Sequence, residues 1–256
     1  MDSSTKCWDG LLAFRSETVG HIWREGLFRI APRSRIDLRL RKNGYFRLRV
    51  LKKTVIVEQV ISHLRQFMAR PLSPEKRSAL LESATQAVAE LGVQASTASI
   101  ARGAGVAEGT LFTYFESKEA LFQELYLHLK RGLADAVMPD YPTGADYRQR
   151  MQHVFERYVN WGLANPSARF AVARLAGSGQ ISDDTRSQGI ERFLAVAQMM
   201  QDGVRDAVLV DAPISFLSSL IEHIADTTIE HIERHPKDAA LQRKLGFRVL
   251  WRAITM

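Results

Sequence analysis

The chain has 256 residues, of which 46% are hydrophobic and 25% are charged, and its formal net charge is +7. This length can bury one large core or two modest ones. No apolar run reaches the roughly 18 residues of a membrane-spanning helix, and the N-terminal region lacks the apolar stretch of a signal peptide. The single cysteine, Cys7, excludes an internal disulfide and fits a reducing cytoplasm.

The positive charge is concentrated in the first quarter of the chain. Residues 1–67 hold 14 Lys and Arg against 6 Asp and Glu, a balance of +8 that leaves −1 for the rest. A basic composition favours nucleic-acid partners, but here it belongs to the leader and not to the body of the chain. Alternating apolar residues and the turn signal Asn43-Gly44 predict a short β-ribbon over residues 34–57. A ribbon of only two strands is marginally stable in water.

The composition changes at Met68. We expect residues 1–67 to be a leader that is either not natively translated, with Met68 as the biological start, or poorly ordered. Two alternatives stay open for this leader. It is a basic arm that grips the DNA backbone, or it is a folded extra element.

From Ser73 onward the sequence predicts helices only. Ser73, Pro74 and Glu75 form a helix start, with a cap, a proline at the first helical position and an acid in the first turn. Gly92 ends this first helix. Further helices are predicted over about 97–104, 108–115, 117–137, 145–164, 167–177, 185–208, 213–234 and 238–254, with a linker over 138–144 and proline or glycine breaks between the others.

Residues 97–121 read TASIARGAGVAEGTLFTYFESKEAL, which predicts two short helices joined by a glycine turn and followed by a third helix. Gly105 permits the left-handed backbone of a sharp turn. Small and apolar residues form the inner face: Ile100, Ala101, Ala104, Leu111 and Phe115. The outer face is predicted to show Thr110, Thr113 and Tyr114 to solvent, where hydroxyl groups suit hydrogen bonds to phosphates and base edges. This is the layout of a helix-turn-helix DNA-binding domain.

Lys118 stands in the first turn of the third helix, behind the expected N-cap Ser117. A cation there opposes the helix dipole at a cost of roughly 0.3–1 kcal/mol, and a bound anion would reverse this cost. Backbone amides, Ser117 and Lys118 together therefore predict a phosphate contact. The alternative is an exposed lysine offset by Glu116 and Glu119.

Residues 75–130 resemble the N-terminal domain of the TetR family of transcriptional regulators. The resemblance rests on a series of residues at fixed spacing and covers under a quarter of the chain. The series is Thr97, Ile100-Ala101, Ala104-Gly105-Val106, Gly109-Thr110-Leu111, Tyr114-Phe115, Lys118 and Leu121.

The resemblance implies a role for each matched position. Thr97 would touch the DNA backbone, Thr110 and Tyr114 would lie in or beside the major groove, and Lys118 would hold a phosphate. Phe112 stands where the family usually has tyrosine, so a phosphate contact would be replaced by an apolar contact with a thymine methyl. Ala107 stands where a serine N-cap is common, which weakens the helix start by about 1 kcal/mol.

The predicted fold class is all-α, with a helix-turn-helix DNA-binding domain over 73–130 and a helical effector-binding and dimerisation domain over 131–256. Two apolar stripes near the C-terminus predict a homodimer through the last two helices, and the alternative is that both stripes pack internally. The first comprises Leu217, Leu220, Ile221, Ile224, Thr228 and Ile232, and the second comprises Leu241, Leu245, Val249, Trp251 and Ile254. Tyr158, Trp161 and Phe193 are the candidates for an effector pocket, and the alternative is that they are ordinary core.

The chain is not expected to be an enzyme or to need a cofactor or metal. His231 and His235 have the spacing of a ligand pair, but a solvated helix end is the favoured interpretation. No phosphate-binding loop or metalloprotease motif is present. The sequence thus predicts a cytoplasmic homodimer that binds a palindromic DNA operator and acts as a repressor under control of a small-molecule effector. The alternative is a helical DNA-binding protein without an effector.

Overall fold

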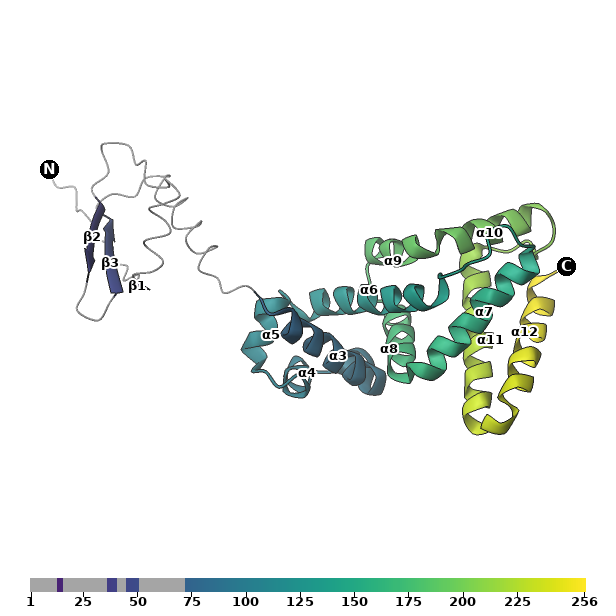
Figure 1. Ribbon diagram of the computed structural model, residues 1–256, viewed down its shortest axis with the longest axis horizontal. Helices are drawn as coiled ribbons and strands as arrows, with labels where there is room; N and C mark the ends of the chain where they lie inside the picture. The colour runs from purple at the N-terminus through teal and green to yellow at the C-terminus, as the bar shows by residue number, and fades with distance from the viewer. Residues whose placement is uncertain (1–12, 16–35, 41–44, 51–71) are drawn as a thin grey trace. The chain divides into compact units, whose positions relative to one another are not determined.

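The computed structural model describes residues 13–15, 36–40, 45–50 and 72–256 (Figure 1). The chain divides into two compact units, residues 1–71 and residues 72–256, which are described separately.

The first unit contains a three-stranded antiparallel sheet in the order β1-β3-β2. Strand β2 (Ile36–Leu40) pairs with β3 (Tyr45–Val50), with Leu40 opposite Phe46, as the predicted ribbon requires. The third strand, β1 (Ala13–Arg15), was not predicted, and it pairs with the other edge of β3. The turn at Asn43-Gly44 and the proposed start at Met68 lie outside the described residues.

The N-terminal part of the second unit, which we call the head, begins with α3 (Pro74–Leu91) and the short 3-10 turn η1 (Gly92–Gln94). It continues with α4 (Thr97–Gly103), α5 (Glu108–Tyr114) and the long α6 (Lys118–Val137). The hydroxyl of Ser73 accepts a hydrogen bond from the amide of Lys76, so the predicted cap and proline start of α3 are confirmed. Gly92 follows the helix with φ of 61°, a left-handed value that favours glycine.

The C-terminal part, which we call the body, is built from helices and short connections, with one isolated β-bridge between Leu209 and Thr255. It comprises α7 (Tyr147–Ala164), α8 (Pro166–Gly177), α9 (Asp183–Ile190), η2 (Glu191–Phe193), α10 (Leu194–Arg205), α11 (Ile214–Arg234), η3 (Pro236–Asp238) and α12 (Ala239–Ile254). No helix within residues 72–256 combines the length and apolar character needed to cross a bilayer.

The prediction of one continuous helix over 185–208 is wrong. The segment is broken into α9, η2 and α10. Gly189, a poor helix former, sits so close to α6 that a Cβ there would come 2.9 Å from the Tyr126 ring. The 3-10 turn that follows places Phe193 under the ammonium of Lys130, 4.9 Å from the ring centroid. Tertiary packing against α6 therefore overrides the helical pattern of this segment.

Two apolar cores stabilise the second unit, and α8 contributes to both. The head core gathers residues of α3 to α6 together with Ala171 and Leu175 of α8. The body core gathers residues of α6, α7 and α10 to α12, and Val172 of α8 packs against it. Lys130, where the predicted DNA-binding domain ends, lies inside α6, so α6 and α8 tie the head to the body.

The two predicted dimer stripes have different environments. Leu217, Ile221 and Ile232 of α11 are at most 8% exposed and belong to the body core, because α11 packs on α7 and α12. The expectation that this stripe pairs across a twofold axis is therefore wrong for these residues. On α12, by contrast, Leu241 and Val249 are exposed by 64% and 48%. Their spacing places them with Leu245 on one face of the helix, which the protomer leaves uncovered.

Candidate DNA-reading surface

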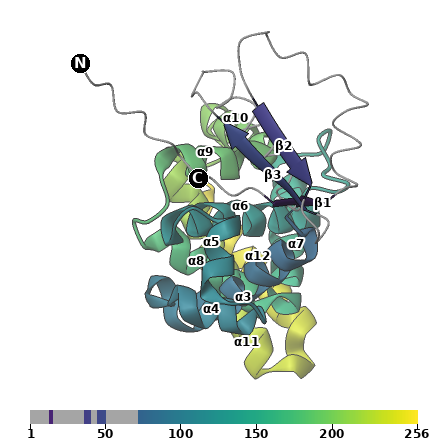
Figure 2. The ribbon, with the colours of Figure 1, turned by 90° about the vertical axis from the view of Figure 1, so that its left-hand side faces the viewer.

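The turn between α4 and α5 has the backbone that the sequence predicts. Gly105 has φ of 68°, its amide donates to the carbonyl of Arg102, and the amide of Val106 donates to the carbonyl of Ala101 at 3.0 Å. These two bonds form a Schellman ending, which satisfies the last carbonyls of α4. The chain therefore reverses within a few residues and brings α5 across α4. Figure 1 shows both helices at the end of the unit away from α11 and α12, and Figure 2 looks at the unit from that end.

Helix α5 is fastened to the head by one face and leaves the other free. Leu111 is completely buried and Phe115 is 2% exposed, while Phe112 is 47% exposed and Thr113 is also exposed. The side chain of Thr110 is half-buried, and the backbone carbonyl of Thr110 accepts a hydrogen bond from the Thr113 hydroxyl. Phe112 and Thr113 thus give the exposed face of α5 one apolar and one hydroxyl-bearing side chain.

Ala107 precedes α5 and forms no side-chain cap, as its side chain dictates. The amide of Thr110 instead donates to the carbonyl of Ala107 at 2.8 Å. The start of α5 therefore depends on backbone hydrogen bonding alone.

Tyr114 differs from the expectation of an outward, solvent-exposed side chain. It is half-buried, and its hydroxyl accepts a hydrogen bond of 3.1 Å from the amide of Ser73. This bond joins the end of α5 to the cap of α3. Tyr114 therefore helps to position α5 within the head, and only the hydroxyl hydrogen is left to donate to a DNA group.

Lys118 also has an intramolecular partner. Ser117 caps α6 by accepting from the amide of Ala120, as predicted, and the ammonium of Lys118 donates to the carbonyl of Val93 at 2.8 Å. The ammonium also lies 5.3 Å from the centroid of the Phe122 ring. The carbonyl and the ring offset the unfavourable helix dipole, a role that neither predicted alternative contained. Two N–H groups of the ammonium remain for a phosphate, so its role there stays a prediction.

Thr97 is the first residue of α4, with Ser96 as the cap. Its hydroxyl donates to Oε1 of Glu108, the first residue of α5, at 2.6 Å. The hydroxyl hydrogen is thus engaged, and the expected contact of Thr97 with the DNA backbone stays a prediction. Sequence reasoning overlooked Glu108, because an acid in the first turn of a helix is ordinary in itself.

The predicted effector residues belong to one apolar cluster of the body. Trp161 is 7% exposed, Tyr158 and Phe193 are half-buried, and the Tyr158 and Trp161 rings lie 5.9 Å apart. The Tyr158 hydroxyl donates to Asp226 at 3.3 Å. Burial and the nearby carboxylate of Asp226 raise the pKa of Tyr158 well above its ordinary value.

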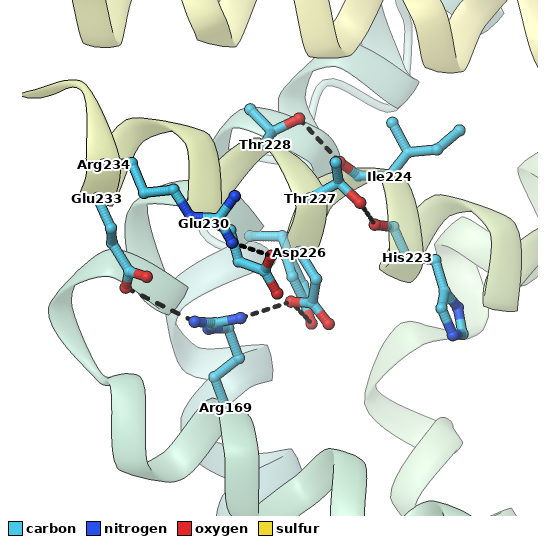
Figure 3. Close-up of polar contacts among 10 residues, drawn as sticks. Arg169, His223, Ile224, Asp226, Thr227, Thr228, Glu230, Glu233 and Arg234 are labelled. Atoms are coloured by element: carbon cyan, nitrogen blue, oxygen red, sulfur yellow. Dashed lines mark hydrogen bonds and ion pairs between the residues drawn. The ribbon is translucent and has the colours of Figure 1, made fainter.

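A buried charged cluster surrounds Arg169, which sequence reasoning did not single out (Figure 3). The Arg169 side chain is 2% exposed, and its guanidinium lies 3.5 Å from Asp226 and 3.6 Å from Glu233, both on α11. Nε and Nη2 of Arg169 are buried without a hydrogen-bond partner. The stem of Arg169 packs closely against Gly162 of α7, where a Cβ would come 3.0 Å from Cδ. The signal in the sequence was weak, because a single arginine in an amphipathic helix is usually exposed.

This head has the geometry of a helix-turn-helix DNA-binding protein of the transcription-regulator class. Residues 80–125 match the model of the bacterial regulatory proteins of the tetR family. An HTH-type transcriptional regulator of Bacillus subtilis, YhgD, is 33% identical over 90 residues, which make up 33% of this chain and 47% of that protein. This chain thus spans about half the length of the curated relative that it matches.

Solved structures extend the similarity to the body. A tetR family transcription regulator from Shewanella sp. PV-4 has a TM-score of 0.63 and 29% identity, over 71% of this chain and 98% of its own. FadR from Bacillus subtilis, solved in complex with stearoyl-CoA, shares the fold with a TM-score of 0.51 and 16% identity, over 68% of this chain and 97% of its own. The match over residues 80–125 and these structures support the TetR family for this chain. These relatives are transcription regulators and not enzymes, in agreement with the predicted class.

Proposed function

We propose that the protein is a ligand-responsive repressor that binds a palindromic DNA operator as a homodimer. The observation that carries this proposal is the two-sided character of α5. Leu111 and Phe115 are buried in the head, while the side chains of Phe112 and Thr113 are exposed. A short helix fixed on one side and apolar and hydroxylic on the other suits insertion into a major groove.

The head has too few cations to bind DNA by charge alone. Residues 73–130 contain five Lys and Arg against seven Asp and Glu. We therefore expect modest non-specific affinity and a shallow dependence on salt for the head. Specific contacts from Phe112, Thr110, Thr113 and Lys118, doubled by a twofold axis, supply the binding energy in this proposal.

The exposed face of α12 supports the homodimer. Leu241, Leu245 and Val249 are spaced by four residues, so they form one apolar ridge along the helix. Phe216 of α11 is a further exposed apolar side chain, at 58%. A second copy of the same face covers such a ridge in an isologous dimer, which a palindromic operator requires.

The arrangement of α8 supports control by an effector. This helix packs along α3 of the head, and the guanidinium of its Arg174 donates to the carbonyl of Glu90 at 3.3 Å. Near its start, Arg169 is paired with α11 of the body. A ligand that binds in the body core at Tyr158 and Trp161, or at Phe193, with different affinity in two positions of α8 would shift the head, as linkage requires. The stearoyl-CoA in FadR is consistent with a fold that can hold a ligand.

A footprint on the promoter region beside the gene, followed by gel-shift titration, tests the DNA part. The Lys118→Ala variant should lose operator retention, whereas Arg131→Ala removes an exposed cation of α6 away from the predicted contact and should bind as the wild type does. Tyr114→Phe is preferable to Tyr114→Ala, because the phenyl ring keeps the packing and only the hydroxyl is lost. Equal binding by Lys118→Ala and the wild type would refute the phosphate role.

A thermal-shift screen separates the effector-controlled repressor from a DNA-binding protein without an effector. A small molecule that raises the melting temperature and also releases the operator supports the repressor. A broad screen without any such molecule favours the alternative. In either case the site of action is the cytoplasm, where bacterial operator DNA lies.

A further inference from the structure

The feature that the proposed function leaves unused is a carboxylate at the leading edge of the DNA-reading helix. Glu108 is the first residue of α5, and its side chain is exposed. Oε1 of Glu108 accepts the Thr97 hydroxyl at 2.6 Å, a short bond that links the starts of α4 and α5. Hydrogen bonds between a hydroxyl and a carboxylate at this distance are among the stronger ones in proteins.

This bond fixes the direction of the carboxylate. Thr97 and Glu108 are eleven positions apart and lie on opposite sides of the turn at Gly105. Because Oε1 is held by Thr97, Oε2 is the oxygen left to accept a hydrogen bond from outside the protein. The amide groups at the start of α5 favour a negative charge at this position, and Ala107 provides no competing side chain.

A carboxylate in this place cannot face a phosphate, because both groups are negative and neither can donate. The suitable partners in a major groove are the exocyclic amino groups of cytosine and adenine. Adenine presents its N7 acceptor next to the amino group, and a carboxylate without a hydrogen is repelled by it. Cytosine presents the N4 amino donor without an acceptor of its own beside it, so cytosine is the better match.

We propose that Glu108 reads the N4 amino group of one cytosine in each operator half-site and that Thr97 is the positioning residue that aims it. This inference rests on the proposed function, since it assumes that α5 enters the major groove. It adds a base preference to the site and gives Thr97 a role different from a backbone contact. Thr97 cannot donate its single hydroxyl hydrogen to Glu108 and to a phosphate at the same time.

The test is selection of binding sites from a random DNA pool by the full-length wild type and by Glu108→Ala, Glu108→Gln and Thr97→Val. The wild type should select cytosine at one position of each half-site. Replacing that base pair by thymine-adenine should weaken wild-type binding about tenfold or more. Glu108→Ala should lose the preference at that position alone and bind both sequences equally, while the preferences at the other positions persist.

Thr97→Val tests whether Thr97 orients the carboxylate, and Glu108→Gln tests whether the carboxylate determines the selected base. Thr97→Val keeps the carboxylate, so it should still prefer cytosine but by a smaller ratio. Glu108→Gln carries an amide donor as well as an acceptor, so it should shift the selected base toward adenine. Thermal melting of each variant should stay close to that of the wild type, because the hydrogen bond that is lost is exposed to solvent.

The outcomes distinguish this inference from the proposed function. Specific selection by the wild type with the same base preferences in Glu108→Ala would overturn the role of Glu108 alone. Selection of adenine, guanine or thymine by the wild type at the position that depends on Glu108 would overturn the cytosine assignment. Failure of the wild type to select any sequence would overturn the proposed function and this inference together.

Discussion

The guanidinium of Arg169 lies 3.5 Å from Oδ1 of Asp226, and the two side chains are unequally buried, at 2% and 29% exposure (Figure 3). Because Arg169 is more deeply buried than Asp226, removing the carboxylate and removing the guanidinium should change the free energy of unfolding by different amounts. Asp226→Ala leaves the buried cation with Glu233, at 3.6 Å, as its remaining carboxylate partner, and should lower the free energy of unfolding by about 2 kcal/mol. Arg169→Met leaves a carboxylate that water can reach, and should change stability by less than about 1 kcal/mol.

Urea unfolding of the two single variants and the double variant measures this asymmetry. The double variant should be more stable than Asp226→Ala, because it removes the uncompensated cation. A larger loss in Arg169→Met than in Asp226→Ala would contradict the prediction.

The raised pKa of Tyr158 predicts that the protein loses stability at alkaline pH. Its pKa is raised by burial and by Asp226, whereas in the unfolded chain the phenol titrates near about 10. Because the folded-state pKa is the higher one, the contribution of the neutral phenol is present below about pH 10 and is lost as the pH rises above it.

The free energy of unfolding of the wild type should therefore fall more steeply between about pH 9.5 and about pH 11 than that of Tyr158→Phe. Part of this fall should remain in Tyr158→Phe, since burial also raises the pKa of Tyr126 and Tyr141. Parallel curves for the two proteins would show that Tyr158 titrates alike in both states.

Gly246 is needed where α12 crosses α11. A Cβ at this position would overlap the hydroxyl of Thr228 and come 3.0 Å from the Phe155 ring. Gly246→Ala should therefore destabilise the body by about 1–3 kcal/mol through overpacking. Gly132→Ala is the matched control, because nothing lies within 4 Å of a Cβ there and it occupies the interior of α6. This control should gain about 0.5–1 kcal/mol from helix propensity, and a shared sign for both variants would refute the packing argument.

The apolar ridge of α12 predicts the oligomeric state. The wild type should have a solution mass of twice 28.9 kDa by light scattering, and Val249→Glu should shift it toward the monomer because a charge would be buried at the interface. Leu91→Glu is the control, since Leu91 is 55% exposed at the end of α3 in the head. A dimer that survives Val249→Glu unchanged would place the interface elsewhere.

Much of the head could be predicted from local sequence. The cap at Ser73, the turn at Gly105 and the burial of Leu111 and Phe115 follow from residue type and spacing, because caps, left-handed turns and helical faces depend on neighbours within a few positions. An outward Phe112 was expected only from the resemblance, which implied a contact with a thymine methyl. These features locate the DNA-reading surface on α5.

The contacts that specialise this surface were decided by tertiary structure. Three hydrogen bonds join residues from different elements: Tyr114 with Ser73, Lys118 with Val93 and Thr97 with Glu108. No local sequence pattern predicts such bonds. The break at Gly189 and the burial of the α11 stripe have the same origin, since both depend on which helix packs alongside. The sequence by itself thus determined the helices and the family of the head. Only the packing of those helices decided which polar groups remain free for a partner, because a hydrogen bond between distant segments exists only when the fold brings its two atoms together.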